Sequence, residues 1–202
     1  MSTLRTSWPP AAIGAALFAG VTAIVALAGF LQLAAAPERE PAIAVLPLAD
    51  THLARAGRAL AEPPTPQRLD AAEREARAAL KLSPARTEAW LQVAYAERQK
   101  AGGWSPAAAQ ALAQSYRVGP LAPDVGTWRL RFALEHWESL TPELRKAALA
   151  ELDALWSRYP MRKALKATAA EVGSPAGRLA FAAEVRSLER AARARAAADR
   201  KH

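Results

Sequence analysis

The chain begins with a long apolar stretch and then changes to mixed apolar and charged positions. Residues 11–36 contain no charged side chain. A membrane-spanning helix needs about 20 apolar residues, so this stretch is long enough to cross a bilayer. The prolines and charges of residues 37–41 end it sharply, because proline resists helix continuation. We therefore predict a transmembrane helix over residues 11–36, between a short tail (1–10) and a linker (37–47).

The N-terminal stretch has two other interpretations. Alanines 34–36 suit a signal peptidase, although the apolar run exceeds the roughly 7–15 residues of a signal core. A buried soluble helix is the third interpretation, but the run has no polar face. Arg5 precedes the run, whereas Arg39 after it is flanked by two glutamates. This arrangement favours a cytoplasmic N-terminus and a periplasmic domain at the inner membrane of a bacterium.

Beyond residue 41, hydroxyl–proline pairs divide the chain at regular intervals. Such a pair places a capping hydroxyl before a proline at the first helical position, where the missing N–H does no harm. The pairs are Thr65-Pro66, Ser105-Pro106, Thr141-Pro142 and Ser174-Pro175. Pro84, Pro120 and Pro160 are expected to end the first three of these helices. The pattern predicts paired helices over 48–61 with 66–82, 86–100 with 106–118, 127–138 with 142–159, and 161–172 with 175–198.

Apolar spacing within these segments supports a helical domain over residues 48–198. Two apolar faces recur at helical spacing: Leu130, Ala133, Leu134 and Trp137, then Ala148, Leu152, Leu155, Trp156 and Tyr159. Alanine, the strongest helix former, dominates the apolar residues, and this abundance also favours an all-α fold. Connections of only a few residues favour antiparallel packing of neighbouring helices. Residues 199–202 form a short, mainly basic tail.

One junction in this domain resembles a tetratricopeptide repeat (TPR). The segment Ala-Leu-Lys-Leu-Ser-Pro at 79–84 resembles the end of one repeat, and Thr-Glu-Ala-Trp-Leu-Gln-Val-Ala at 87–94 resembles the start of the next. A weaker second copy begins at 115–120, so the resemblance covers roughly 66–160. Glu97 departs from the family, which usually has an aromatic residue there. The resemblance implies an all-α fold in which a single transmembrane helix precedes a short TPR-like solenoid of antiparallel hairpins.

The resemblance also implies a binding surface. In the repeat family, the first helix of each pair lines a concave groove that holds a protein partner. Carried over to this chain, that rule predicts the partner-binding residues Leu91, Tyr95, Arg98, Trp128, Arg131 and Glu135. Such repeats bind many unrelated peptides, so the partner's identity and the oligomeric state stay open.

Positive charge is concentrated near the C-terminus. The net charge is +8, and residues 161–202 hold ten lysines and arginines against four acids. Arg186, Arg190 and Arg193 follow helical spacing, and we predict that they contact an anionic surface. A solvated capping helix is the alternative interpretation.

The sequence contains no pattern that indicates catalysis, so we expect no catalytic, cofactor-binding or metal-binding residue and no enzyme. There is no cysteine, and His52, His136 and His202 do not follow a metal-ligand spacing. No nucleophile elbow or phosphate-binding loop is present. Four carboxylates lie on arginine-rich helices, where we expect solvated ion pairs: Glu73, Glu75, Glu143 and Glu151. Three tryptophans at helical spacing are expected in the core: Trp128, Trp137 and Trp156.

The function predicted from these patterns is a membrane-anchored, TPR-like scaffold for protein–protein interaction in a bacterial cell envelope. The lipid bilayer is then a second partner, through residues 11–36. One alternative is a cytosol-facing membrane protein whose basic C-terminal helix binds anionic lipid or, as the less favoured ligand, nucleic acid. Another is an envelope enzyme with an unrecognised site.

Overall fold

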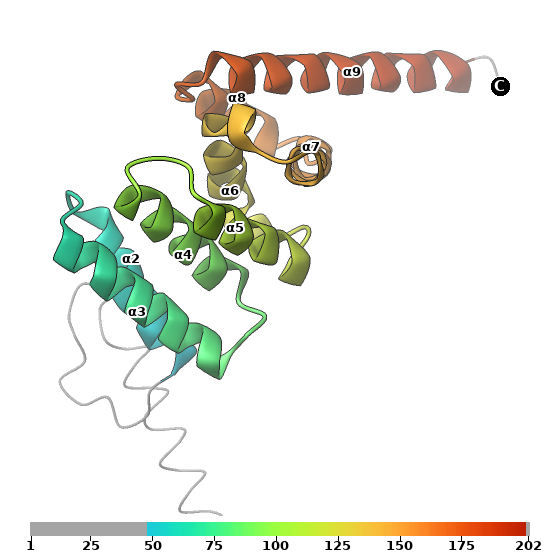
Figure 1. Cartoon of the computed structure of the whole chain (residues 1–202). Coiled ribbons are helices and arrows are strands. Elements are labelled where there is room, and N and C mark those ends of the chain that lie inside the picture. The colour runs from blue at the N-terminus through green and yellow to red at the C-terminus, as the bar shows by residue number, and fades with distance from the viewer. Residues whose placement is uncertain (1–47, 201–202) are drawn as a thin grey trace, which may run out of the picture.

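A computed structural model describes residues 48–200, and these residues fold into eight α-helices and one short 3₁₀-helix with no strand (Figure 1). The prediction of an all-α fold is therefore confirmed for this part of the chain. The helices are α2 (Ala49–Ala61), α3 (Pro66–Leu82), α4 (Thr87–Lys100), α5 (Pro106–Val118), α6 (Pro123–Glu135), η1 (Trp137–Ser139), α7 (Pro142–Trp156), α8 (Met161–Ala170) and α9 (Pro175–Asp199). The predicted N-terminal tail, transmembrane helix and linker lie outside the described residues, as do the last two residues of the basic tail. None of the helices in residues 48–200 has the length and apolar character required to cross a membrane.

The four hydroxyl–proline pairs start helices as predicted. In each pair the proline occupies the first turn and the hydroxyl oxygen accepts a hydrogen bond from a backbone N–H three residues on. The acceptors are Thr65, Ser105, Thr141 and Ser174, at donor distances of 3.3, 3.1, 3.3 and 3.0 Å. This bond satisfies a backbone donor that the start of a helix otherwise leaves unpaired.

Two helices differ from their predicted extents by more than two residues at one or both ends. Helix α6 begins at Pro123, four residues early, because this proline also suits the first turn, and it ends at Glu135, so that Trp137 falls in η1. Helix α7 ends at Trp156, and Tyr159 lies in the turn before Pro160 with 79% of its surface exposed. The prediction that Tyr159 belongs to the buried face of α7 is therefore wrong. The helix ends too early to carry it.

Helices α2–α5 form two stacked hairpins in the lower part of Figure 1, an arrangement compatible with a helical repeat. Their backbones lie close together because the interfaces are lined mainly by alanine, the smallest side chain with a Cβ atom. Eight of these alanines are at most 1% exposed: Ala56, Ala72, Ala76, Ala79, Ala89, Ala94, Ala96 and Ala108. The amide of Gln92 on α4 also donates a 3.2 Å bond to the carbonyl oxygen of Leu53 on α2.

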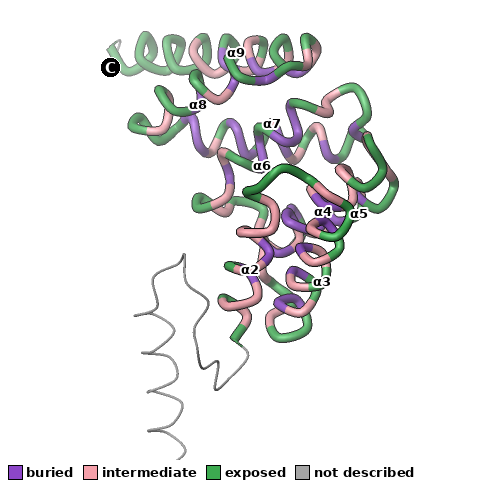
Figure 2. Tube along the Cα trace, turned by 90° about the vertical axis from the view of Figure 1, so that its left-hand side faces the viewer, coloured by how far each residue is buried: buried purple, intermediate pink, exposed green. Residues whose placement is uncertain are grey.

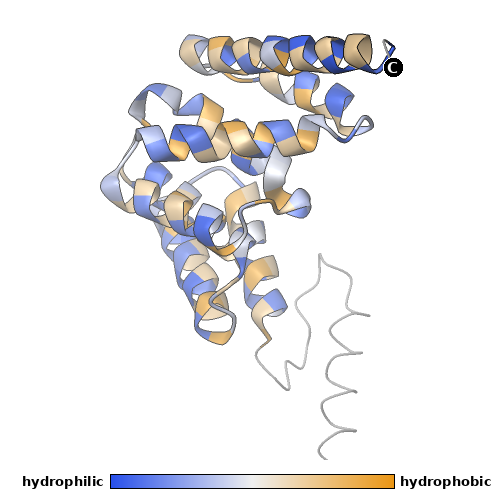
Figure 3. Ribbon diagram, turned by 90° about the vertical axis from the view of Figure 1, so that its right-hand side faces the viewer, coloured by the Kyte–Doolittle hydropathy of each residue, from blue (hydrophilic) through white to orange (hydrophobic). Residues whose placement is uncertain are grey.

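Helices α6–α9 bury larger side chains and lie above this pair of hairpins, with α9 across the top of the molecule (Figure 1). The core here contains Leu130, Leu134, Leu152, Trp156 and Phe181. Figure 3 shows that apolar and polar residues alternate along these helices, as expected for helices with one buried face.

Helix α9 crosses α6 at Gly177 with almost no space between the two backbones. A Cβ atom at Gly177 would lie 1.9 Å from the carbonyl oxygen of Leu134, closer than any real contact. The crossing therefore requires glycine at this position.

A buried ion pair lies where the two halves of the domain meet. Arg129 on α6 is 0% exposed and pairs with Glu151 on α7, which is 1% exposed. The Nη1 atom of Arg129 also donates to the carbonyl oxygens of Ser115 and Gly119 at the end of α5, both at 2.9 Å. The prediction that Glu151 forms a solvated ion pair is therefore wrong. Its helix packs against α6, and its carboxylate is enclosed there.

Burial dominates the electrostatics of this pair. It raises the pKa of the Glu151 carboxyl, and hydrogen bonds from Arg129 and Tyr116 oppose that change. The Tyr116 hydroxyl lies 3.2 Å from Glu151, and burial also raises the pKa of this phenol. The guanidinium lies 4.2 Å from the centre of the Tyr116 ring, so it is held by a cation–π contact as well.

Candidate functional site

A hollow of about 480 Å³ opens between α4, α6 and the connection from α8 to α9. We call it the partner groove. It is lined by Tyr95, Arg98, Gln99, Trp128, Arg131, Phe132, Glu135, His136, Glu171 and Gly173. Five of the six residues predicted to bind a partner are among them, so the structure brings those five together.

Leu91 is the sixth predicted residue, and the structure places it elsewhere. Its side chain is 0% exposed and belongs to the hydrophobic core. The prediction that Leu91 faces the groove is therefore corrected. It lies one helical turn before Tyr95 but on the part of α4 that packs inward.

Aromatic rings form one wall of the partner groove. The centre of the Tyr95 ring lies 6.1 Å from that of Trp128 and 6.2 Å from that of Phe132. Trp104, from the connection between α4 and α5, lies 5.9 Å from Phe132 and 5.1 Å from His136. These separations are typical of tilted aromatic pairs, which hold one another in fixed orientations. Trp128 is 38% exposed, so this predicted core tryptophan instead presents a face to solvent.

Three residues of this aromatic cluster were not predicted from the sequence. Phe132 lies one turn after Trp128, so helical spacing indicates it, whereas Trp104 packs against Phe132 from a loop. His136 follows the last residue of α6. Its position depends on where that helix ends, which the sequence placed too late.

Arg98 is the cation of the groove without a carboxylate partner. Its Nη1 atom donates to the side-chain oxygen of Gln99 at 2.9 Å, and Gln99 in turn donates to the hydroxyl of Tyr95 at 2.8 Å. Among residues 48–200, no carboxylate lies within ion-pair distance of Arg98, and its buried Nε has no hydrogen-bond partner. The arginine is thus oriented by neutral groups and keeps its charge available.

His136 is held neutral beside this arginine. Burial lowers its pKa below the usual 6.5, and the positive charge of Arg98 lowers it further, whereas Glu135 acts in the opposite direction. An imidazole with a lowered pKa is uncharged at neutral pH. Within the groove, Arg98 is therefore a cation without a carboxylate partner, next to the aromatic wall and an uncharged imidazole.

The two remaining predicted residues are already engaged by the connection between α8 and α9. The Nη1 atom of Arg131 lies 2.6 Å from a carboxylate oxygen of Glu171. The carboxylate of Glu135 accepts a 2.7 Å hydrogen bond from the backbone N–H of Gly173. These bonds attach the far wall of the groove to α6 and involve no nitrogen of Arg98.

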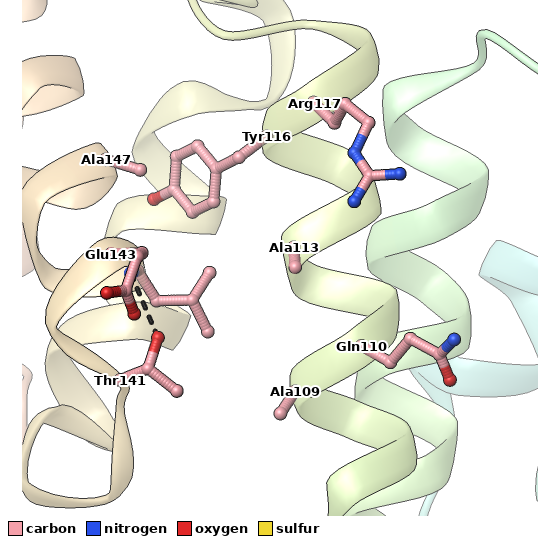
Figure 4. A pocket seen from close by; sticks show the side chains of 9 residues that line it. Ala109, Gln110, Ala113, Tyr116, Arg117, Thr141, Glu143 and Ala147 are labelled. Atoms are coloured by element: carbon pink, nitrogen blue, oxygen red, sulfur yellow. Dashed lines mark hydrogen bonds between the residues drawn. The ribbon is translucent and has the colours of Figure 1, made fainter.

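A second hollow, of about 470 Å³, lies between α5 and α7 (Figure 4). Its walls include three alanines, with the Tyr116 ring between the two helices and Glu143 at one end. The pKa of the Glu143 carboxyl is lowered by hydrogen bonds from the backbone N–H of Glu143 and from the Thr141 hydroxyl. The sequence did not indicate this hollow, because no single helix contains it.

Elsewhere, Arg186, Arg190 and Arg193 lie on α9 and line a separate hollow of about 270 Å³ together with Glu189. The Nδ1 atom of His52 lies 2.6 Å from the carboxylate of Glu75, between α2 and α3. Within residues 48–200, no group of three or more histidines and acidic residues is arranged to hold a metal ion.

Comparison with known protein families, curated proteins and solved structures finds no match for this chain. The geometry of the partner groove and of the surfaces around it therefore indicates the function of the domain.

Proposed function

We propose that this protein is a membrane-attached scaffold whose TPR-like hairpins hold a segment of a partner protein in the partner groove. The observation that carries the proposal is the groove itself, where exposed aromatic surface surrounds an arginine without a carboxylate partner. Buried aromatic and arginine side chains supply most of the binding energy at protein interfaces. A guanidinium flanked by neutral groups suits a carboxylate or backbone carbonyl of the partner.

The proposal also includes the cellular location of the protein. The apolar run of residues 11–36 would attach the domain to the inner membrane, with residues 48–200 on the periplasmic side. On this proposal the protein acts by binding, and no residue has a catalytic role.

Site-specific photocrosslinking in cells tests the groove. A photoreactive amino acid at Trp128 should form a defined adduct with one partner, because this side chain is partly exposed at the groove wall. The same amino acid at Gln110, which lines the hollow between α5 and α7, is the matched control. Adducts that are equal at both positions, or absent from Trp128, would contradict the proposal.

The affinity of the identified partner then tests Arg98. Replacing Arg98 with glutamine preserves the length and polarity of the side chain but removes its charge. We expect roughly thirtyfold weaker binding, the effect of losing one central interface residue. Arg117→Gln removes an exposed charge that is not part of the groove and should leave the affinity unchanged. Equal affinities for the two variants would exclude Arg98 from the interface.

A further inference from the structure

We propose that the outward face of α9 binds the surface of an anionic phospholipid bilayer through Arg186, Arg190 and Arg193, which we call the basic stripe. This contact is separate from the partner groove. It gives the domain a second attachment besides the predicted transmembrane helix.

The first observation is where the charge lies. Residues 48–156 contain fourteen lysines and arginines and thirteen acids, and are close to neutral. Residues 157–200 contain ten lysines and arginines but only four acids. Almost all of the excess positive charge of the described residues therefore belongs to the last two helices and the turns beside them.

The second observation is that the basic stripe is not used within the fold. In the first hairpins, several surface cations are paired: Lys100, for example, lies 2.6 Å from Asp70 and 2.8 Å from Glu73. No described carboxylate lies within ion-pair distance of any of the three stripe arginines. Their charges are available to an external anion.

The third observation is the orientation of α9. Gly177, Phe181 and Val185 are buried at intervals of four residues and place one face of the helix on the domain. The stripe residues recur at intervals of four and three residues on the opposite face, and all three are exposed. Side chains in such a row can meet a flat surface together.

The end of α9 extends beyond the rest of the domain. Every residue from 190 to 200 is exposed, and Figures 1 and 2 show the helix continuing past α8 with no other element beside its end. A planar surface can therefore approach the stripe without steric obstruction from the body of the domain.

Apolar side chains on the same face favour a bilayer over a nucleic acid. Leu179 lies two turns before Arg186 on the stripe face and is 68% exposed, and Ala182 and Ala197 follow the same spacing. Helices that lie on anionic membranes combine basic side chains near the phosphates with apolar side chains at the acyl boundary. Single-stranded nucleic acids are instead held by exposed aromatic rings, and the aromatic residue of α9, Phe181, is buried.

Three arginines alone bind a membrane weakly, because each contributes only about a fivefold gain in affinity. A tether to the same bilayer would raise the local concentration of lipid headgroups and make this contact effective. The predicted helix over residues 11–36 would provide such a tether.

A single label on the stripe face tests the proposal in the full chain. The protein has no cysteine, so Ala197→Cys provides a unique position for an environment-sensitive fluorophore. The labelled protein is reconstituted with phosphatidylcholine vesicles, with or without phosphatidylglycerol. We expect a blue shift and quenching by lipid-attached quenchers only when phosphatidylglycerol is present, and loss of both at high salt. The label reports local contact and not attachment through the N-terminus.

Two charge-matched variants distinguish the stripe from net charge. Replacing Arg186, Arg190 and Arg193 with glutamine should abolish the lipid-dependent shift. Replacing Arg117, Lys146 and Arg195 with glutamine removes the same charge from other surfaces and should preserve it. Circular dichroism should show equal helix content in both variants, because all six positions are exposed.

Three results would overturn the proposal. One is a shift that does not depend on phosphatidylglycerol, and another is an equal loss of the shift in both variants. The third is a shift produced by duplex DNA or single-stranded RNA in the absence of vesicles, which would make the stripe a nucleic-acid site.

Discussion

The two halves of the domain hold their helices together in different ways. In α2–α5 the interfaces are lined by alanine, the backbones lie close together, and ion pairs such as that of Lys100 with Glu73 stay at the surface. In α6–α9 the interfaces contain leucine, phenylalanine and tryptophan, and the ion pair of Arg129 with Glu151 is enclosed. Side-chain size thus sets the distance between helices, and the larger spacing leaves room for a buried ion pair.

This difference explains where the hollows occur. The partner groove lies between α4 and α6, and the second hollow lies between α5 and α7, so both are found where the closely packed hairpins meet the wider half. The change in packing therefore leaves hollows where α2–α5 meet α6–α9. Arg129 holds these two halves together by binding the end of α5. A regular stack of identical hairpins would not contain such a step.

Breaking the buried pair should have the largest effect on stability. Arg129→Met leaves Glu151 buried without its cation and leaves the carbonyls of Ser115 and Gly119 without their donor. We expect a loss of about 3–5 kcal/mol in the free energy of unfolding, measured by urea denaturation. In the double variant with Glu151→Leu, most of the loss should be recovered, because no unpaired charge is buried. A double variant as unstable as the single one would show that the hydrogen bonds to α5 matter more than the charge.

Enlarging a side chain in the first half should have an intermediate effect. Ala76 is 0% exposed, so Ala76→Leu has no space for the added carbons and should destabilise the domain by about 1–3 kcal/mol. Ala107→Leu makes the same change at an exposed position of α5 and should change stability by less than about 0.5 kcal/mol. Thermal unfolding of the two variants under the same conditions compares them. Similar melting temperatures would mean that the first half is less tightly packed than its alanines indicate.

The smallest expected effect is the change in stability with pH that His136 causes. Because its pKa is lowered in the folded protein, the unfolded chain binds a proton more readily. The free energy of unfolding should therefore decrease as the pH falls from 7 through 6.5, the ordinary pKa of histidine. His136→Phe keeps a ring against Trp104 and Phe132 but cannot be protonated, so it should flatten this part of the stability profile. An unchanged profile would assign the pH dependence to another group.

Much of the fold could be predicted because its signals are local. Thr65 and the three other capping residues each start a helix next to their proline. The resemblance to tetratricopeptide repeats placed five groove residues on α4 and α6. Burial of Arg129 could not be predicted, since nothing next to it in the sequence distinguishes it from the exposed Arg131. Its environment is made by α5 and α7, and only their packing encloses it. The same reason explains why Leu91 was misplaced, because the inward side of α4 depends on its neighbours.

Gly177 has an effect that extends well beyond its own contact. A helix is a rigid rod with about 100° of rotation per residue, so the contact with Leu134 fixes the rotation of α9 about its own axis. Arg193 lies sixteen residues further on, about 24 Å along that axis. The absence of one methyl group at Gly177 therefore determines the direction in which the distant arginines point. A helix that rotated to accommodate an alanine there would keep its charge and its length, but it would turn the arginines away from the surface they now face.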